Sequence, residues 1–164
     1  GKLGAKVARV GLAFDMEVIA WSENLSSDRA EEIGVKLVKK NELIKSSDII
    51  SIHLVLSDRT RGLIGKQEFL SMKPTSYLIN TSRGPIIDES ELINALKNKE
   101  IAGAGLDVYS IEPLPIDNQL RSLKNVVLTG HTGFVVTELH ALVYGQAVEN
   151  IQAWISGTPL RLLN

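Results

Sequence analysis

Short apolar segments alternate with helical patterns along almost the whole chain, and this alternation is the strongest constraint on its fold. The run at 48–56, DIISIHLVL, is continuous and apolar, as expected for a strand buried on both faces of a sheet. The other expected strands are 17–21, 35–38, 76–80, 103–108 and 125–129, and the expected helices are 2–14, 27–33, 41–46, 65–72, one that opens at 88–91, and 137–156. This order predicts a mostly parallel, doubly wound α/β sheet.

Length and charge narrow the class of protein. The 164 residues suit one domain with a sizeable core. Eighteen basic and nineteen acidic residues give a formal net charge of −1, which favours neither nucleic acid nor an anionic membrane as partner. The chain has no cysteine, so disulfides, thiolate zinc sites and a cysteine nucleophile are excluded. We predict no metal site and no membrane span, and we expect a cytoplasmic protein.

Three side chains of different chemistry each follow an expected strand. Arg83 comes after the strand at 76–80, Glu112 after the strand at 103–108, and His131 after the strand at 125–129. The carboxyl ends of parallel strands share one crevice, and ligands bind there. A guanidinium, a carboxylate and an imidazole that are far apart in sequence are therefore expected to meet around one substrate.

The first residues read as part of a phosphate-binding turn. Gly1 and Gly4 open a helix directly, as the last glycines of a G-x-G-x-x-G motif do. In that motif the helix N-terminus offers free N–H groups to a pyrophosphate. A packing role for the two glycines is an equally good interpretation of these residues alone. The strand at 17–21 supports the motif, because it ends about 20 residues later, where ribose recognition is expected.

Four stretches together resemble a known family. They are GKLG at 1–4, NTSRGPIIDE at 80–89, LDV at 106–108 with Glu112 and Pro113, and HTG at 131–133. The chain is similar over essentially its whole length to the NAD(P)-binding domain of the D-isomer-specific 2-hydroxyacid dehydrogenases. The resemblance implies a Rossmann-like fold and hydride transfer between NAD or NADP and a small 2-hydroxyacid or 2-ketoacid. It also implies a homodimer formed through this domain.

The family's catalytic roles map onto three residues. Arg83 would bind the substrate carboxylate and polarise the C2 oxygen, because its planar fork of donors fits both carboxylate oxygens. His131 would be the base in hydroxyacid oxidation and the acid in ketoacid reduction. Glu112 would hold His131 in the useful tautomer and stabilise its protonated form.

The resemblance also implies the cofactor contacts. Asp107 would bond the nicotinamide carboxamide, and His53 and Leu54 would flank the adenine, although His53 is more easily interpreted as a packing residue. The expected cofactor-binding residues are Gly1, Lys2, Leu3, Gly4, Ser22, His53, Leu54, Thr81, Ser82, Arg83, Asp107, His131 and Gly133.

Three positions depart from the family pattern, and one of them is Val55, which replaces a proline that is frequent after His53. Ser22 stands where NAD-preferring members commonly carry an acid that bonds the ribose hydroxyls. Glu23 could substitute for that acid, whereas Arg29 could reach a 2′-phosphate, so the preference for NAD or NADP stays open. Gly130 precedes His131 where the family usually has a stiffening proline.

The resemblance further implies an incomplete unit. The family builds its substrate domain mainly from residues that precede the nucleotide domain, and the first strand of the sheet also lies before Gly1. We therefore expect a fragment, inactive alone, whose sheet is incomplete at the first strand. Residues 1–164 would form the nucleotide-binding domain, with about 137–164 leading back to the substrate domain. Unpaired inner edges would promote self-association.

A non-enzymatic alternative belongs to a different class. Dinucleotide-binding domains of this type also serve as nucleotide-sensing interaction modules, as in transcriptional corepressors that resemble the family. A sensor needs only the nucleotide contacts. The presence of Arg83, Glu112 and His131 therefore favours an enzyme over a nucleotide sensor.

Overall fold

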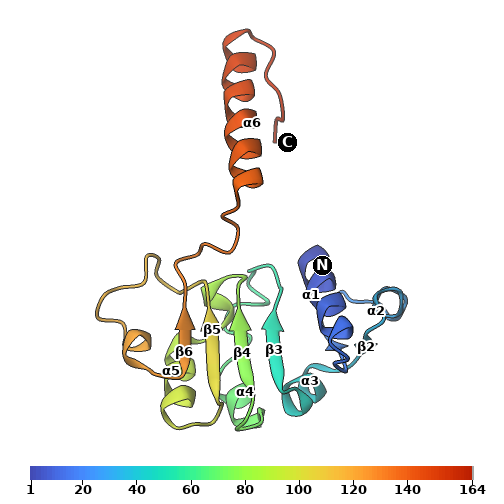
Figure 1. The fold of residues 1–164 in the computed structure, drawn as a ribbon, viewed down its shortest axis with the longest axis vertical. Helices are drawn as coiled ribbons and strands as arrows, with labels where there is room; N and C mark the ends of the chain where they lie inside the picture. Colours follow the sequence, from blue (N-terminus) through green and yellow to red (C-terminus); the bar gives the residue numbers. More distant parts are fainter. Residues whose placement is uncertain (164) are drawn as a thin grey trace. The chain divides into compact units, whose positions relative to one another are not determined.

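The computed structural model describes residues 1–163. The chain divides into two compact units, of which the first ends at His131 and the second begins at Thr132. All strands lie in the first unit, in the expected alternation with helices (Figure 1). Its helices are α1 (Lys2–Ala13), α2 (Ser27–Ile33), α3 (Lys40–Ser46), α4 (Lys66–Ser71) and α5 (Glu89–Lys97), with short 3-10 helices η1 (Gly84–Ile86) and η2 (Gln119–Ser122). Its strands are β1 (Ile19–Ala20), β2 (Lys36–Leu37), β3 (Ile49–Ile52), β4 (Tyr77–Asn80), β5 (Gly103–Leu106) and β6 (Val126–Leu128).

Four of the strands form one parallel sheet in the order β3-β4-β5-β6. The last residues of neighbouring strands are paired, because Ile52 lies opposite Asn80 and Leu106 lies opposite both Asn80 and Leu128. The carboxyl ends of these strands therefore lie at one edge of the sheet (Figure 1). The prediction of a parallel α/β fold is confirmed.

The two remaining strands, β1 and β2, form a separate parallel pair. Within residues 1–163 no strand joins β1 to β3, as expected for a sheet that is incomplete at this place. The prediction that 48–56 is a strand buried on both faces is wrong. The strand ends at Ile52, and Ile49 is 52% exposed while Ile50 and Ile52 are buried. Ile49 lies on the face turned away from the core, and its partner Tyr77 in the interior strand β4 is 51% exposed in the same way.

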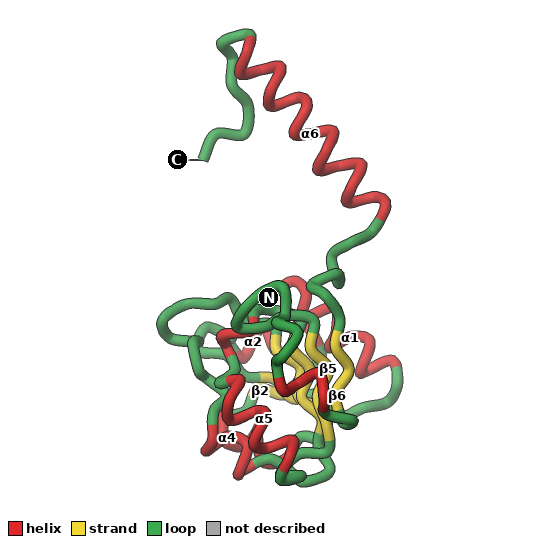
Figure 2. Tube along the Cα trace, turned by 90° about the vertical axis from the view of Figure 1, so that its left-hand side faces the viewer, coloured by secondary structure: helices red, strands yellow, loops and turns green. Residues whose placement is uncertain are grey.

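The core lies between one face of the four-stranded sheet and the helices on that side. In Figure 2, α4 and α5 lie on one side of the strands and α1 on the other. Phe69 of α4 and Leu92 of α5 are almost fully buried against alternate strand residues such as Leu78. Alternate burial along the strands fixes which strand residues face the core.

Local capping signals set the ends of several helices. The Ser26 hydroxyl accepts a hydrogen bond from the Arg29 amide at the start of α2, and Gly34 ends that helix with φ of +83°. The Asp88 carboxylate accepts from the amides of Ser90 and Glu91 at the start of α5, which confirms the predicted helix start.

The second unit contains α6 (Thr137–Ile155), which is followed by Gly157 with φ of +74°. This agrees with the helix expected at 137–156. No helix within residues 1–163 is both long enough and apolar enough to cross a lipid bilayer.

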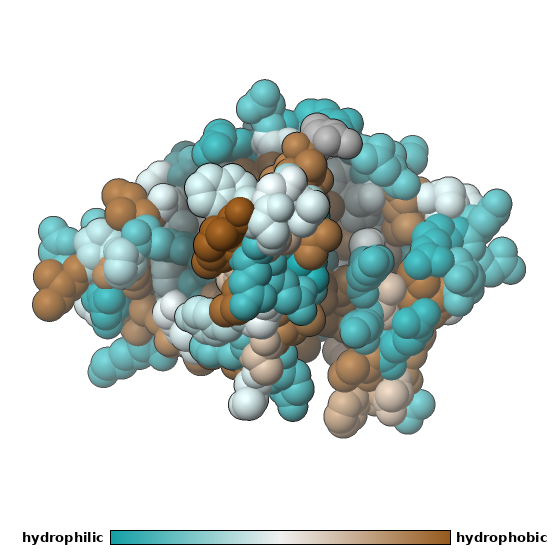
Figure 3. Space-filling model, turned by 90° about the horizontal axis from the view of Figure 1, so that it is seen from above, coloured by the Kyte–Doolittle hydropathy of each residue, from teal (hydrophilic) through white to brown (hydrophobic). Residues whose placement is uncertain are grey.

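Apolar side chains also reach the surface of the first unit. Leu3 and Val10 of α1, and Phe14 directly after it, are each more than half exposed. Figure 3 shows apolar residues scattered among hydrophilic ones on the face that it views. This exposure is consistent with a sheet whose neighbouring elements are incomplete.

Candidate active site

The three predicted catalytic residues lie beyond the carboxyl ends of three neighbouring strands. Arg83 follows β4, Glu112 follows β5, and His131 follows β6. Because these strands are adjacent and parallel, their loops open on the same edge of the sheet. The expected convergence of the three loops is thus present in the fold.

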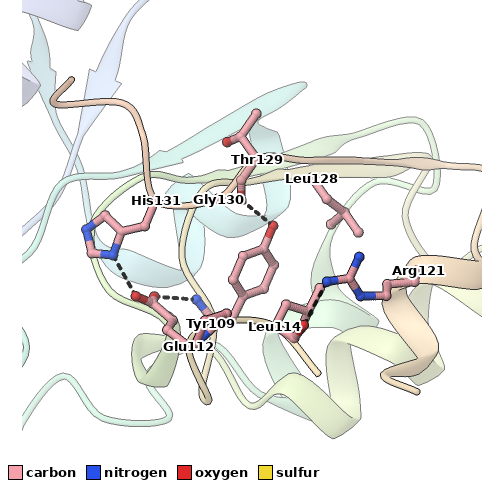
Figure 4. Close-up of a pocket in the computed structure, with 9 residues that line it drawn as sticks. Tyr109, Glu112, Leu114, Arg121, Leu128, Thr129, Gly130 and His131 are labelled. Atoms are coloured by element: carbon pink, nitrogen blue, oxygen red, sulfur yellow. Dashed lines mark hydrogen bonds and ion pairs between the residues drawn. The ribbon is translucent and has the colours of Figure 1, made fainter. Parts of the chain in front are cut away.

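Glu112 and His131 form a direct pair (Figure 4). His131 Nδ1 lies 2.6 Å from Glu112 Oε2, and the Tyr109 amide donates to Glu112 Oε1 at 2.9 Å. The hydrogen bond with His131 is the main reason why the pKa of Glu112 is below its ordinary value, and burial opposes it only in part. The Tyr109 amide and the positive charge of Arg83 act in the same direction. Arg83 is therefore close enough to act electrostatically on this pair.

His131 has an unusual backbone. Its φ is +57°, in the left-handed region that residues other than glycine seldom adopt. Such conformations cluster at functional sites, where the surrounding structure holds them. Here the Glu112 carboxylate holds the imidazole by its Nδ1 atom. The ring is therefore fixed by its contact with Glu112, although Gly130 replaces the stiffening proline.

Buried Asn80 shapes the loop that carries Arg83. Its Nδ2 donates to the Arg83 carbonyl at 2.9 Å, and its Oδ1 accepts from the Ser82 amide at 3.0 Å. The Ser82 hydroxyl donates to the Ile52 carbonyl at 2.8 Å, which ties this loop to β3. Asn80 opens the NTSRGPIIDE stretch, but no role for its side chain was predicted from the sequence. The available signal was an amide side chain at the last position of an apolar strand, where a buried polar group needs partners.

A cavity of about 480 Å³ adjoins the Glu112–His131 pair (Figure 4). Tyr109 lines one side of it, and its single hydroxyl hydrogen is shared between the carbonyls of Thr129, at 2.7 Å, and Leu106, at 3.1 Å. Neither Tyr109 nor the cavity was expected from the sequence. The cavity is lined by Tyr109, Glu112, Pro113, Leu114, Arg121, Leu128, Thr129, Gly130 and His131.

Asp107 is almost fully buried directly after β5. Only 6% of its surface is exposed, and the Thr129 hydroxyl donates to its Oδ1 at 2.5 Å. Burial, and then the negative charge of Asp107, raise the pKa of the nearby Tyr109 hydroxyl. Asp107 therefore lies at the carboxyl edge of the sheet, almost fully buried and bonded to Thr129.

The predicted phosphate turn lies at the start of α1. Gly1 is the N-cap residue, no side chain caps this end, and the first turn carries no acidic residue. An uncapped helix N-terminus leaves N–H donors for an anion. A Cβ atom on Gly4 would lie 3.3 Å from His53 Cβ, so the absence of a side chain lets α1 lie close to the loop after β3.

His53 packs at this contact. Its Nε2 lies 3.0 Å from the Ser51 hydroxyl, and burial lowers its pKa. These contacts support the packing interpretation of His53. Leu54 follows it in the same loop and is partly buried.

The charged residues near Ser22 are paired with other side chains. Arg59 Nη1 binds Glu23 Oε2 at 3.0 Å, and Arg29 binds Glu32. Arg59 lies in the loop after β3 and was not expected here. Both candidate determinants of cofactor preference, Glu23 and Arg29, thus already have a partner of opposite charge.

The remaining predicted residues divide between the two units. Thr81 and Ser82 lie beside Arg83 in the loop after β4. Gly133 belongs to the second unit, whereas all other predicted site residues belong to the first. The first unit therefore brings together every predicted catalytic residue.

Comparisons with known proteins show the family of the chain. The sequence model of the D-isomer specific 2-hydroxyacid dehydrogenase NAD binding domain matches residues 1–133. The chain is 40% identical over 165 residues to glyoxylate reductase from Aeropyrum pernix, an alignment that covers 100% of this chain and 49% of the relative. The chain spans about half the length of the curated relatives it matches.

Solved structures show the same relationship. A D-isomer specific 2-hydroxyacid dehydrogenase from Lactobacillus delbrueckii ssp. bulgaricus, in its NAD-complexed form, superposes with a TM-score of 0.82 at 29% identity, covering 100% of this chain and 53% of that one. An acyclic imino acid reductase in complex with NADPH and D-arginine gives 0.78 at 34% identity, covering 100% and 51%. By sequence and by fold, the chain belongs to the D-isomer specific 2-hydroxyacid dehydrogenase family and carries its nucleotide-binding domain.

Proposed function

We propose that this chain supplies the nucleotide-binding and catalytic half of an oxidoreductase that interconverts a small 2-ketoacid and a D-2-hydroxyacid. The observation that carries the proposal is the Glu112–His131 pair at 2.6 Å, with Arg83 following the adjacent strand. A nucleotide sensor needs no imidazole held in this way. The corepressor-like alternative has no comparable observation in its favour.

Each of the three residues has a distinct task in ketoacid reduction. Arg83 binds the substrate carboxylate and polarises the C2 carbonyl. His131, held through Nδ1 by Glu112, gives a proton from Nε2 to the carbonyl oxygen. Glu112 fixes the tautomer and stabilises the protonated ring before the transfer. The bound NADH or NADPH supplies the hydride that reduces C2.

The residues at the start of α1 fit a dinucleotide. The uncapped N-terminus with Gly1, Lys2 and Leu3 would hold the pyrophosphate, because N–H donors and a lysine are present and acidic residues are absent. Ser22 would face the ribose, and Asp107 the nicotinamide carboxamide. Either NAD or NADP is accepted by this family of folds, since the two solved neighbours hold NAD and NADPH respectively.

Catalysis by this domain requires a second domain that covers the exposed side of the active site. We propose that a substrate domain closes over Arg83 and His131 and excludes water, as in other two-domain enzymes. Residues 137–164 would lead towards that domain, and the enzyme would be a homodimer. The 164-residue chain alone would therefore bind the nucleotide without measurable turnover.

A chimera tests the proposal. This chain would replace the matching half of the glyoxylate reductase to which it is 40% identical, so that the relative supplies the other half. Oxidation of NADH and NADPH would be followed with glyoxylate, hydroxypyruvate and pyruvate. The 164-residue chain would be assayed beside it for nucleotide binding by fluorescence titration.

Three outcomes are distinguishable. Turnover by the chimera together with binding only by the isolated chain supports the proposal. Nucleotide binding by a folded chimera without turnover of any ketoacid would favour the sensor. Turnover by the isolated chain would contradict the need for a second domain.

A further inference from the structure

Glu89 links helix α5 to the loop that carries Glu112. Its Oε2 accepts from the Ser110 amide at 3.1 Å, and its Oε1 accepts from Asn118 Nδ2 at 2.9 Å. The two partners lie on either side of Glu112 in the sequence, so one carboxylate ties both ends of the loop. We infer that Glu89 is a positioning residue that sets the place of Glu112 and, through it, of His131. This inference rests on the proposed function.

The Ser110 amide adjoins the amide that holds Glu112 itself. Tyr109 N donates to Glu112 Oε1 at 2.9 Å, and the next amide in the chain donates to Glu89. The peptide unit between Tyr109 and Ser110 therefore cannot turn without breaking the bond to Glu89. The Tyr109 amide belongs to the preceding peptide unit, so Glu89 and Glu112 accept from two successive peptide units that share the Tyr109 Cα atom.

The same peptide touches the loop that carries Arg83. A Cβ atom on Gly84 would lie 2.0 Å from the Tyr109 carbonyl carbon and 2.6 Å from the Ser110 nitrogen. The backbone at Gly84 is thus pressed against the peptide that Glu89 holds. Because Gly84 directly follows Arg83, one peptide sets the spacing between the Arg83 and Glu112 loops.

The returning half of the loop is tied in a similar way. Asn118 Oδ1 caps η2 by accepting from the Leu120 amide at 2.9 Å, while its Nδ2 donates to Glu89. Arg121 of η2 donates to the carbonyls of Leu114, at 2.7 Å, and Pro115, at 2.9 Å. Glu89 therefore anchors η2 and the segment after Glu112 to the start of α5.

The test is an NMR titration of the Glu112 carboxyl carbon in the 164-residue chain. In Glu89→Gln one carboxylate oxygen is replaced by an N–H₂ group, which cannot accept a hydrogen bond. Because Ser110 N and Asn118 Nδ2 are both donors, at least one of the two hydrogen bonds is lost. We expect the pKa of Glu112 to rise towards its ordinary value in this variant, because its bonds to His131 and Tyr109 loosen. Loss of a negative charge alone would lower the pKa of Glu112, so the sign of the change separates the two effects.

Glu91→Gln is the matched control. It removes the same charge from the first turn of the same helix, and within residues 1–163 the Glu91 side chain has no hydrogen bond or ion pair with this loop. We expect no rise in the pKa of Glu112. Asn118→Ser is a second test, because serine can still cap η2 but is too short to reach Glu89.

A rise in the pKa of Glu112 in both Glu89→Gln and Asn118→Ser supports the inference. An unchanged or lowered pKa in Glu89→Gln overturns it if the amide spectrum shows a folded chain. If Glu89→Gln does not fold, Asn118→Ser is the deciding variant: a raised pKa of Glu112 supports the inference, and an unchanged or lowered pKa overturns it. The readout is a titration and not turnover, so its failure would leave the proposed dehydrogenase function standing.

Discussion

At the scale of single residues, the shape of the Arg83 side chain matters as much as its charge. We predict that Arg83→Lys in the chimera raises the KM for the ketoacid about 10- to 100-fold, because a point charge replaces a bidentate donor in a charged hydrogen bond. Steady-state kinetics at saturating NADH measure this. Arg61→Lys, at an exposed position in the same unit, should leave the KM unchanged. If the KM for the ketoacid is the same in Arg83→Lys as in the parent chimera, Arg83 does not bind the substrate carboxylate.

Gly84 is a second residue with a specific steric role. A methyl group there would overlap the Tyr109–Ser110 peptide at 2.0 Å. We predict that Gly84→Ala lowers the free energy of unfolding by about 1–3 kcal/mol or more, since overpacked backbone must shift. Gly130→Ala is the control, because nothing lies within 4 Å of a Cβ atom at that position. Chemical denaturation compares the two, and equal stability would contradict the close approach.

The residues of the site differed in how far the sequence could predict them. Arg83, Glu112 and His131 were accessible because charged side chains after apolar strands stand out and match a family. Asn80 and Glu89 lie in the quoted stretch at 80–89, but their roles were not predicted, because their partners are backbone groups and an amide up to 29 residues away. Such contacts depend on the tertiary path of loops, which no local pattern encodes.

At the scale of elements, the start of α5 depends on Asp88. Its carboxylate accepts from two first-turn amides, so we predict that Asp88→Ala costs about 1 kcal/mol of unfolding free energy near neutral pH. The Ser90 side chain, followed by the amide of Glu91, lowers the pKa of Asp88 from its ordinary 3.8. A lowered pKa means that this contribution is present above about pH 4 and is lost as the pH falls through the folded value.

Asp88→Asn provides the control, because asparagine also caps helices but does not titrate. Below pH 4 the native chain should therefore lose unfolding free energy relative to Asp88→Asn, because only aspartate becomes protonated. Denaturation curves at pH 6 and pH 3 measure the difference. If the native chain and Asp88→Ala differ in unfolding free energy by the same amount at pH 6 and pH 3, the role of the charged cap is contradicted.

Helices were predicted more closely than strands for a physical reason. Caps and periodicity are local, so α2 begins and ends as expected and Gly34 terminates it. Strand length depends on pairing with neighbours. Among residues 1–163, β1 pairs only with β2, and it is much shorter than the expected 17–21. The same dependence explains why β3 ends at Ile52, before the end of the apolar run.

At the scale of the whole molecule, open strand edges and exposed apolar side chains favour association. Within residues 1–163 no strand lies between β1 and β3, and Leu3 and Val10 of α1 and the following Phe14 are exposed. We predict that the isolated chain sediments as a dimer or a larger species at micromolar concentrations, because unpaired edges recruit partners. A monomer at all concentrations in analytical ultracentrifugation would contradict this.

We propose that His131, held by Glu112, transfers the proton during ketoacid reduction. The most direct measurement is kcat of the chimera with His131→Gln, beside the nucleotide affinity of the same variant. We predict that kcat falls about 10²- to 10⁴-fold, the usual contribution of a positioned acid–base group, while nucleotide affinity stays the same. A His131→Gln chimera that keeps kcat within a few-fold of the parent would contradict the assignment of the active site.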